Sequence, residues 1–90
     1  MAHVIVRHKV NDYTSWKTVF DTHVDFRGSA GEKAYHIFRS STDPNDVTVL
    51  MEWDSMRNAE KFFASAELKT AMQKAGVAEE PEIQFLNEAA

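Results

Sequence analysis

The hydrophobic pattern of this chain changes between a period of two and a period of about 3.6 residues in a fixed order, and this order limits the possible folds most strongly. The opening segment HVIVRHKV alternates, so that Val6 and His8 share one face, as in a strand. Residues 13–28 then follow a helical period, after Asp12 as a predicted N-cap and with Gly28 as a predicted breaker. A strand therefore leads directly into one amphipathic helix.

The rest of the chain predicts two further strands joined by a turn, a second helical region and a final strand. β-Branched and aromatic residues fill EKAYHIFRSS and VTVLMEW, and the turn TDPND between them predicts a hairpin. Asp54 is the predicted N-cap of a helix that starts near Met56, and Ser65 restarts it as a short segment that ends at Gly76. The segment PEIQFL closes the chain as the last strand.

The resulting order, βαββα(α)β, predicts an α+β fold of the ferredoxin-like type, with a four-stranded antiparallel sheet and helices on one face. No linker or repeat interrupts the 90 residues, so we expect a single domain over residues 1–90. The second face of the sheet would carry the residues Ile5, Arg7, Leu50, Glu52, Phe38 and His36. Arg7 and Glu52 predict a salt bridge there, and the apolar residues predict a cover, most simply a second copy of the chain in a homodimer.

Composition and charge exclude several classes of function. The net charge is -4 without a run of Lys or Arg, so we expect no nucleic-acid partner. There is no cysteine, and the four histidines lack metal-ligand spacing, so we expect neither disulfides nor a metal site. The opening segment is too short and too charged for a signal peptide or a membrane span, which predicts no membrane association and a cytoplasmic location.

Two polar residues of the first predicted helix do not follow its amphipathic pattern. The residues Tyr13, Trp16, Val19, Phe20, Val24 and Phe26 gather on one helical face, and His23 and Arg27 fall inside this apolar arc. An imidazole and a guanidinium that face the core either belong to a ligand site or stabilise the fold. In the structural role, His23 would form a hydrogen bond with a backbone carbonyl, and Arg27 would reach a carboxylate such as Glu32.

The segment VTVLMEWDSMRNAEKFFASAELKTAM combines a strand that ends in an aromatic residue, a capped helix and a Ser-x-x-Leu restart. In this it resembles the antibiotic biosynthesis monooxygenases of the dimeric α/β-barrel superfamily. The resemblance covers nearly the whole chain and includes a DYxxW…F…H…R…G pattern. It implies that two ferredoxin-like protomers join their sheets face to face. Because the superfamily also includes haem degraders, isomerases and ligand sensors, the pattern is more specific for fold than for function.

In the oxygenases of this family the ligand lies between the sheet and the helices of each protomer. Carried onto this chain, the walls of that site would be Val6, His8, Met51 and Trp53 from the strands and Phe20, His23, Arg27, Phe63 and Met72 from the helices. Haem-degrading relatives place an iron-binding histidine where this chain has Met72, and a catalytic asparagine on the first strand, which has none here. We therefore expect no haem and no other cofactor.

Within this site His8, His23 and Arg27 are the candidate catalytic residues. A half-buried imidazole with a pKa near about 6.5 can take a proton from a phenol or an activated carbon acid at neutral pH. Arg27 could then hold the resulting oxyanion. The resemblance implies a cofactor-free monooxygenase or cyclase for a small apolar or aromatic, polyketide-like substrate. The alternative is a non-catalytic ligand-binding or structural homodimeric module of the same fold.

Overall fold

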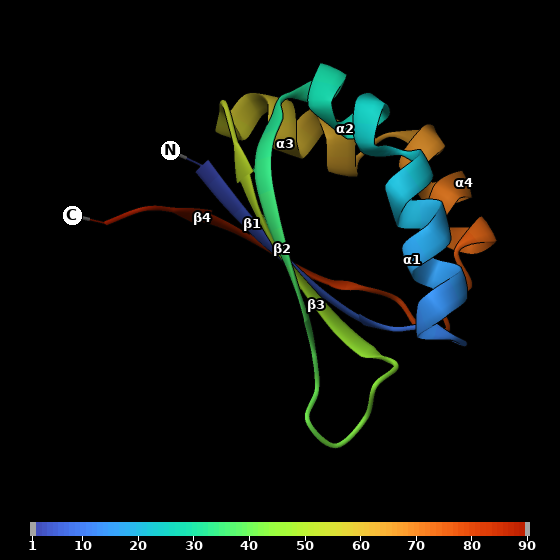
Figure 1. The fold of residues 1–90 in the computed structure, drawn as a ribbon. Helices are drawn as coiled ribbons and strands as arrows, with labels where there is room; N and C mark the ends of the chain where they lie inside the picture. The colour runs from blue at the N-terminus through green and yellow to red at the C-terminus, as the bar shows by residue number, and fades with distance from the viewer. Residues whose placement is uncertain (1, 90) are drawn as a thin grey trace.

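The computed structural model describes residues 2–89 as one four-stranded sheet with four helices. The elements are β1 (Ala2–Lys9), α1 (Tyr13–Thr22), α2 (Val24–Ala30), β2 (Glu32–Arg39), β3 (Asp46–Trp53), α3 (Met56–Phe63), α4 (Ala66–Lys74) and β4 (Glu82–Asn87). Figure 1 shows the helices arched over one side of the curved sheet, with the β2–β3 loop extending beyond it. The predicted order of strands and helices is confirmed.

The sheet has the strand order β2-β3-β1-β4, and each neighbouring pair is antiparallel. In the two central strands Val4 lies opposite Met51 and Val6 lies opposite Val49. Because side chains alternate along a strand, these four point to the same face, and all are buried. This arrangement confirms the ferredoxin-like α+β fold.

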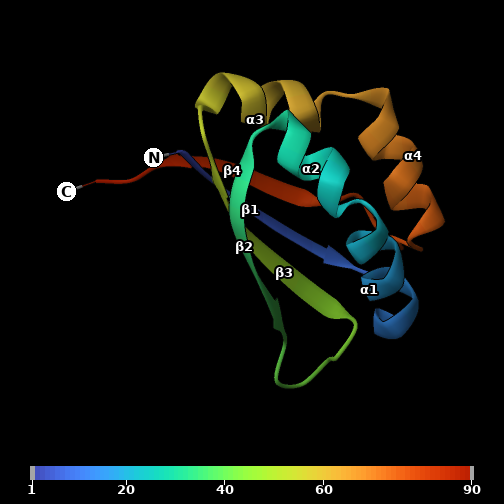
Figure 2. The same ribbon diagram turned by 45° about the horizontal axis from the view of Figure 1, so that its top comes forward.

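The helices cover only this face, as the rotated view in Figure 2 shows. Trp16 of α1 and Ala59 and Phe62 of α3 are buried against the valines of the central strands. By contrast, α4 contains no buried residue. The core is therefore anchored by α1 and α3, and α4 is the least buried part of the helical layer.

The opposite side of the sheet, called the open face below, has no helix over it. The strand register assigns to it the residues Ile5, Arg7, His36, Phe38, Leu50, Glu52 and Leu86. Arg7 binds both carboxylate oxygens of Asp46, at 3.2 and 2.8 Å. The predicted bridge from Arg7 to Glu52 is therefore wrong. Arg7 lies opposite Thr48, so Asp46 is its diagonal neighbour, whereas Glu52 lies opposite His3.

The first helix is interrupted at His23, where a single helix through residue 28 was predicted. The Val19 carbonyl accepts hydrogen bonds from Thr22 Oγ1 at 2.7 Å and from the His23 ring at 2.8 Å. The Phe20 carbonyl accepts one from Arg27 Nη1 at 2.6 Å. Side chains thus occupy the carbonyls at the end of α1, which ends the helix there.

The remaining helix ends are set by local capping bonds. Asp12 and Ser65 each accept a hydrogen bond from a backbone N–H three residues on, as predicted. The cap of α3 is Ser55 and not the predicted Asp54. Asp54 instead donates its backbone N–H to the carbonyl of Gly31, which has a φ of 125°. A Cβ at residue 31 would lie 2.5 Å from the Asp54 carboxylate, so this turn requires glycine.

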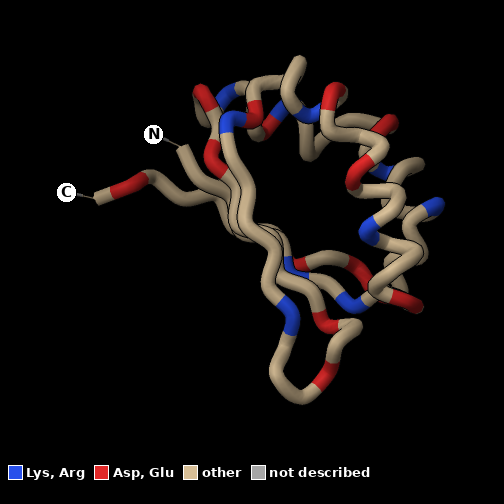
Figure 3. The backbone as a smooth tube through the Cα atoms, viewed as in Figure 1, with Lys and Arg blue, Asp and Glu red and all other residues tan. Residues whose placement is uncertain are grey.

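Charged residues are distributed over the whole fold. Figure 3 shows Lys and Arg interspersed with Asp and Glu along helices, strands and loops. Among the helices of residues 2–89, none is long and apolar enough to cross a membrane.

Candidate functional site

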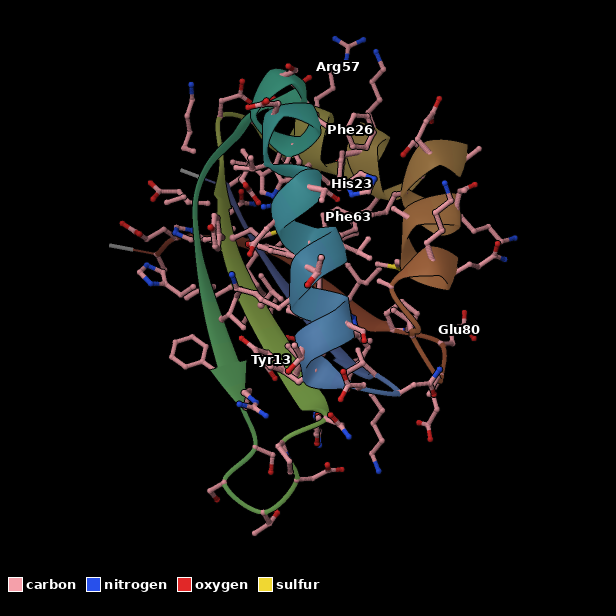
Figure 4. All side chains as sticks on the ribbon, turned by 45° about the vertical axis from the view of Figure 1, so that its right-hand side comes forward. Tyr13, His23, Phe26, Arg57, Phe63 and Glu80 are labelled. Atoms are coloured by element: carbon pink, nitrogen blue, oxygen red, sulfur yellow. The ribbon has the colours of Figure 1, made fainter. Side chains whose placement is uncertain are left out.

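A cavity of about 70 Å³ lies between the sheet and the helices. Its lining includes eight of the nine residues predicted for the site: Val6, His8, Phe20, His23, Arg27, Met51, Phe63 and Met72. Figure 4 shows His23, from the junction of α1 and α2, and Phe63, from α3, in the space between the α1–α2 pair and the α3–α4 pair. The fold therefore brings together residues that are distant in the sequence.

Trp53 is the predicted site residue that does not line the cavity. It is completely buried, with its ring centroid 5.0 Å from that of Phe62 and 6.0 Å from that of Phe63. It lies beneath two phenylalanines that do face the cavity. Its position at the end of β3, behind α3, makes it a support of the wall.

Eight further lining residues were not named as site residues from the sequence: Trp16, Val19, Phe26, Val49, Phe62, Leu68, Ala71 and Ala75. Leu68 and Ala71 of α4 share one helical face with Met72. This helical spacing in the sequence could have identified Leu68 and Ala71 as inward-facing residues. The sequence gives no sign of which inward residues border a cavity and which are packed without space.

His8 is held in β1 with only 6% of its surface exposed. Neither ring nitrogen has a hydrogen-bond partner among residues 2–89. Its ring stands edge-on to Trp16 at a centroid distance of 5.6 Å. Burial lowers its pKa to about 4, although Asp46 opposes this shift. The pKa of His8 therefore lies below the ordinary value for an imidazole, and the side chain is uncharged at pH 7.

His23 lies at the junction of α1 and α2 and is partly buried. Its Nδ1 lies 2.8 Å from the carbonyl of Val19, so Nδ1 carries the proton and donates it to that oxygen. In the neutral ring Nε2 then holds the free electron pair. No residue among 2–89 hydrogen-bonds to Nε2, so this atom is available as a proton acceptor.

Arg27 is 3% exposed and is fixed from three sides. Its Nε donates to both carboxylate oxygens of Glu32, at 3.0 and 3.1 Å, and its Nη1 donates to the Phe20 carbonyl. The guanidinium also lies 3.6 Å above the Phe20 ring. Burial raises the pKa of Glu32, and Arg27 opposes this rise. The pair thus balances charge inside the protein and leaves Nη2 without a partner among residues 2–89.

Aromatic rings connect these polar groups. Trp16 and Phe20 stack at a centroid distance of 5.0 Å, with His8 beside Trp16 and Arg27 over Phe20. The cavity is consequently an apolar space with an imidazole at one end of the stack and a guanidinium at the other. Within residues 2–89 no group of three potential metal ligands comes together.

Comparison with solved structures relates this geometry to known proteins. The chain has the fold of antibiotic biosynthesis monooxygenase structures. A provisionally named antibiotic biosynthesis monooxygenase from Bordetella bronchiseptica has a TM-score of 0.80 at 17% identity, with 99% of this chain and 97% of that chain covered. A similarly named protein from Caulobacter crescentus has a TM-score of 0.76 at 22% identity, with 99% and 90% covered.

SnoaB, a cofactor-independent oxygenase from Streptomyces nogalater, is similar to this chain with a TM-score of 0.79 at 13% identity, and 99% of this chain and 93% of SnoaB are covered. Neither a protein-family model nor a curated protein sequence matches the chain. The resemblance stated from the sequence is thus confirmed at the level of the fold. At these identities activity does not follow from the likeness.

Proposed function

We propose that this chain is a cofactor-free monooxygenase or cyclase that binds a small apolar or aromatic substrate in the cavity. The observation that carries the proposal is His23. Its Nδ1 is fixed by the Val19 carbonyl, its Nε2 has no hydrogen-bond partner among residues 2–89, and the residue lines the nearly apolar cavity. A neutral imidazole held in this way can act as a general base toward a substrate bound in the cavity.

In the proposed mechanism Nε2 of His23 takes a proton from a phenol or an activated carbon acid. The Nη2 of Arg27 has no hydrogen-bond partner among residues 2–89 and can stabilise the anion that forms. Aromatic and aliphatic walls keep water away from this anion. It then reacts with an internal electrophile in a cyclase. In an oxygenase it reduces dioxygen, so that one oxygen atom converts a substrate methylene to a carbonyl and the other leaves as water.

The test is His23→Asn, whose side-chain amide can still donate to the Val19 carbonyl but cannot act as a base. We expect the rate of dioxygen uptake or ring closure, measured on small activated phenols, to fall by about 10²–10⁴-fold. His36→Asn on the open face is the matched control and should retain the rate. Equal rates for the wild type and His23→Asn would remove His23 from the chemistry.

A non-catalytic binding or structural module is the second candidate function. It is favoured by the bonds that His23 and Arg27 make to Val19, Phe20 and Glu32, which tie α1 and α2 to the start of β2. In this case His23→Ala should lower the free energy of unfolding by more than about 1 kcal/mol, and no substrate should turn over. A melting temperature unchanged by His23→Ala would count against the structural role.

We also propose that the protein forms a homodimer through the open face. Phe38 is 55% exposed and Leu86 is 39% exposed on this face, beside Ile5 and Leu50 of the central strands. Exposed apolar side chains gathered on a sheet face are usually covered, and a second copy is self-complementary by two-fold symmetry. Sedimentation at micromolar concentration should give twice the mass of one 10.3 kDa chain.

A further inference from the structure

The cavity contains polar atoms that the protein itself does not satisfy. Both ring nitrogens of His8 lack a hydrogen-bond partner among residues 2–89, although 94% of this residue is shielded from solvent, as its 6% exposure shows. Buried polar atoms are nearly always paired, so an unpaired imidazole that lines a cavity points to a ligand group. His8 needs one acceptor for its N–H and one donor for its free nitrogen.

The charge of the cavity narrows the class of ligand. The positive charge of Arg27 is matched by Glu32 at 3.0 Å, and no other ionised side chain lines the cavity among the residues described. A carboxylate would therefore enter an apolar space without a surplus positive charge to balance it. A protonated amine would be repelled by the positively charged guanidinium of Arg27. The site has the chemistry for an uncharged molecule.

We propose that His8 recognises the hydroxyl group of a small, uncharged, ring-shaped ligand, whose ring lies against the Trp16–Phe20 stack. A hydroxyl can pair with either ring nitrogen of His8, because it can accept from the N–H or donate to the free nitrogen, and an aromatic ring fits the apolar walls. His8 is then a specificity-determining residue and not a base. This inference rests on the proposed ligand site, but it is independent of the chemistry proposed for His23.

The residues shared by the cavity and an outer groove point to the route by which such a ligand enters. A cavity of about 70 Å³ is smaller than the ~150 Å³ cavity that holds benzene in another protein, so one wall must move. An outer groove of about 330 Å³ lies beside it, lined by His23, Ala66, Glu67, Thr70, Ala71 and Lys74. His23 and Ala71 border both spaces. Since α4 has no buried residue, it is the wall that can shift to admit a ring past His23.

The experiment compares three probes of similar size, phenol, benzene and benzoate, by NMR titration of the full chain without dioxygen. We expect phenol to bind at least about tenfold more tightly than benzene, and benzoate not to bind. In His8→Phe this preference for phenol over benzene should disappear. In His8→Gln, which keeps one donor and one acceptor, it should remain. A ratio of two affinities is unaffected by a partial loss of folded protein.

Three outcomes would overturn the inference: equal affinity for phenol and benzene, preferred binding of benzoate, or an undiminished phenol preference in His8→Phe. Absence of binding by all three probes would overturn it as well. Failure of the proposed function has a different signature. Selective phenol binding through His8 without any turnover would support this inference and contradict the oxygenase and cyclase. Turnover that depends on His23, with a phenol preference unaffected by His8→Phe, would support the proposed catalytic function and contradict the role of His8 in ligand recognition.

Discussion

At the scale of single residues, the burial of His8 makes stability depend on pH. Its pKa is lowered from 6.5 to about 4, so between these values the unfolded chain binds a proton that the folded chain does not. The stabilising contribution is complete above pH 6.5 and is lost as the pH falls towards 4. We expect the wild type to lose roughly 3 kcal/mol more than His8→Gln between pH 7 and pH 4, measured by urea unfolding.

This comparison separates His8 from other acid-sensitive groups. The pKa of Asp46 is lowered by its hydrogen bonds with Arg7, so its contribution is also lost in acid. Because Asp46 and Arg7 are present in both proteins, most of their effect cancels in the difference, and the interaction of Asp46 with His8 is the smallest of the causes that lower the pKa of Asp46. Parallel curves of stability against pH for the wild type and His8→Gln would show that His8 is not desolvated in solution.

The buried pair of Arg27 and Glu32 gives a second prediction for single residues. Each side chain is at most 5% exposed, so removing one partner leaves an uncompensated charge inside the fold. Glu32→Gln and Arg27→Met should each lower the free energy of unfolding by about 3–5 kcal/mol, and the double variant should lose less than the sum. Denaturant titration of the cycle measures this coupling. As a control, Lys17→Ala, in the exposed pair with Asp21, should change the free energy of unfolding little. If the losses in Arg27→Met and Glu32→Gln were additive in the double variant, this would contradict the pairing of Arg27 with Glu32.

At the scale of elements, α4 is expected to open independently of the rest of the fold. It has no buried residue, whereas α3 buries Ala59 and Phe62. Ser65 caps α4 by accepting from the backbone N–H of Leu68 at 3.3 Å. Ser65→Ala should therefore raise amide hydrogen exchange in α4 by about fivefold, without a similar rise in β1 and β3.

The corresponding cap of α3 provides the control. Ser55 accepts from the N–H of Asn58 in a helix that belongs to the core. Ser55→Ala should therefore lower the global free energy of unfolding and raise exchange throughout the sheet. If Ser65→Ala also acted globally, α4 would be part of the cooperative core, and the proposed route past His23 would lose its moving wall.

Element types were predictable from the sequence because each depends on a local period. The strands alternate and Asp12 and Ser65 are standard caps, so these features were predicted correctly. The interruption at His23 was not, because it depends on three-dimensional contacts. Thr22, His23 and Arg27 reach back to carbonyls of α1, and Arg27 can do so only because Glu32 fixes its other side. Likewise Asp54 is an acceptable cap by sequence, but its place beside Gly31 leaves that role to Ser55.

The candidate site was predictable to the same extent and for the same reason. The inward direction of residues such as Val6, Phe20 and Met72 follows from periodicity combined with the order of the layers. How deeply each residue is buried does not follow from periodicity. Trp53 has the same inward direction as Met51 but lies beneath Phe62 and Phe63, and the lowered pKa of His8 depends on how completely the helices exclude water.

At the scale of the whole molecule, the helices cover one face of the sheet, and no helix lies over the open face. Leu50 lies near the centre of the open face and Phe38 on the neighbouring strand, so a carboxylate at either position would be buried in the proposed dimer. Leu50→Glu and Phe38→Glu should each weaken dimerisation by at least about a hundredfold, because an unpaired charge would lose its water. The measurement is sedimentation over a concentration series.

Val24→Glu is the matched control for this prediction. Val24 is 46% exposed, between Leu86 and Phe38 in exposure, but it lies on α2, on the helical side of the sheet. A dimer through the open face predicts that Val24→Glu sediments as the wild type does, while the two open-face variants sediment as single chains. If all three variants dissociated, the contact would involve the helical layer. If the wild type were itself a 10.3 kDa species at micromolar concentration, the exposed open face would be stable without a partner.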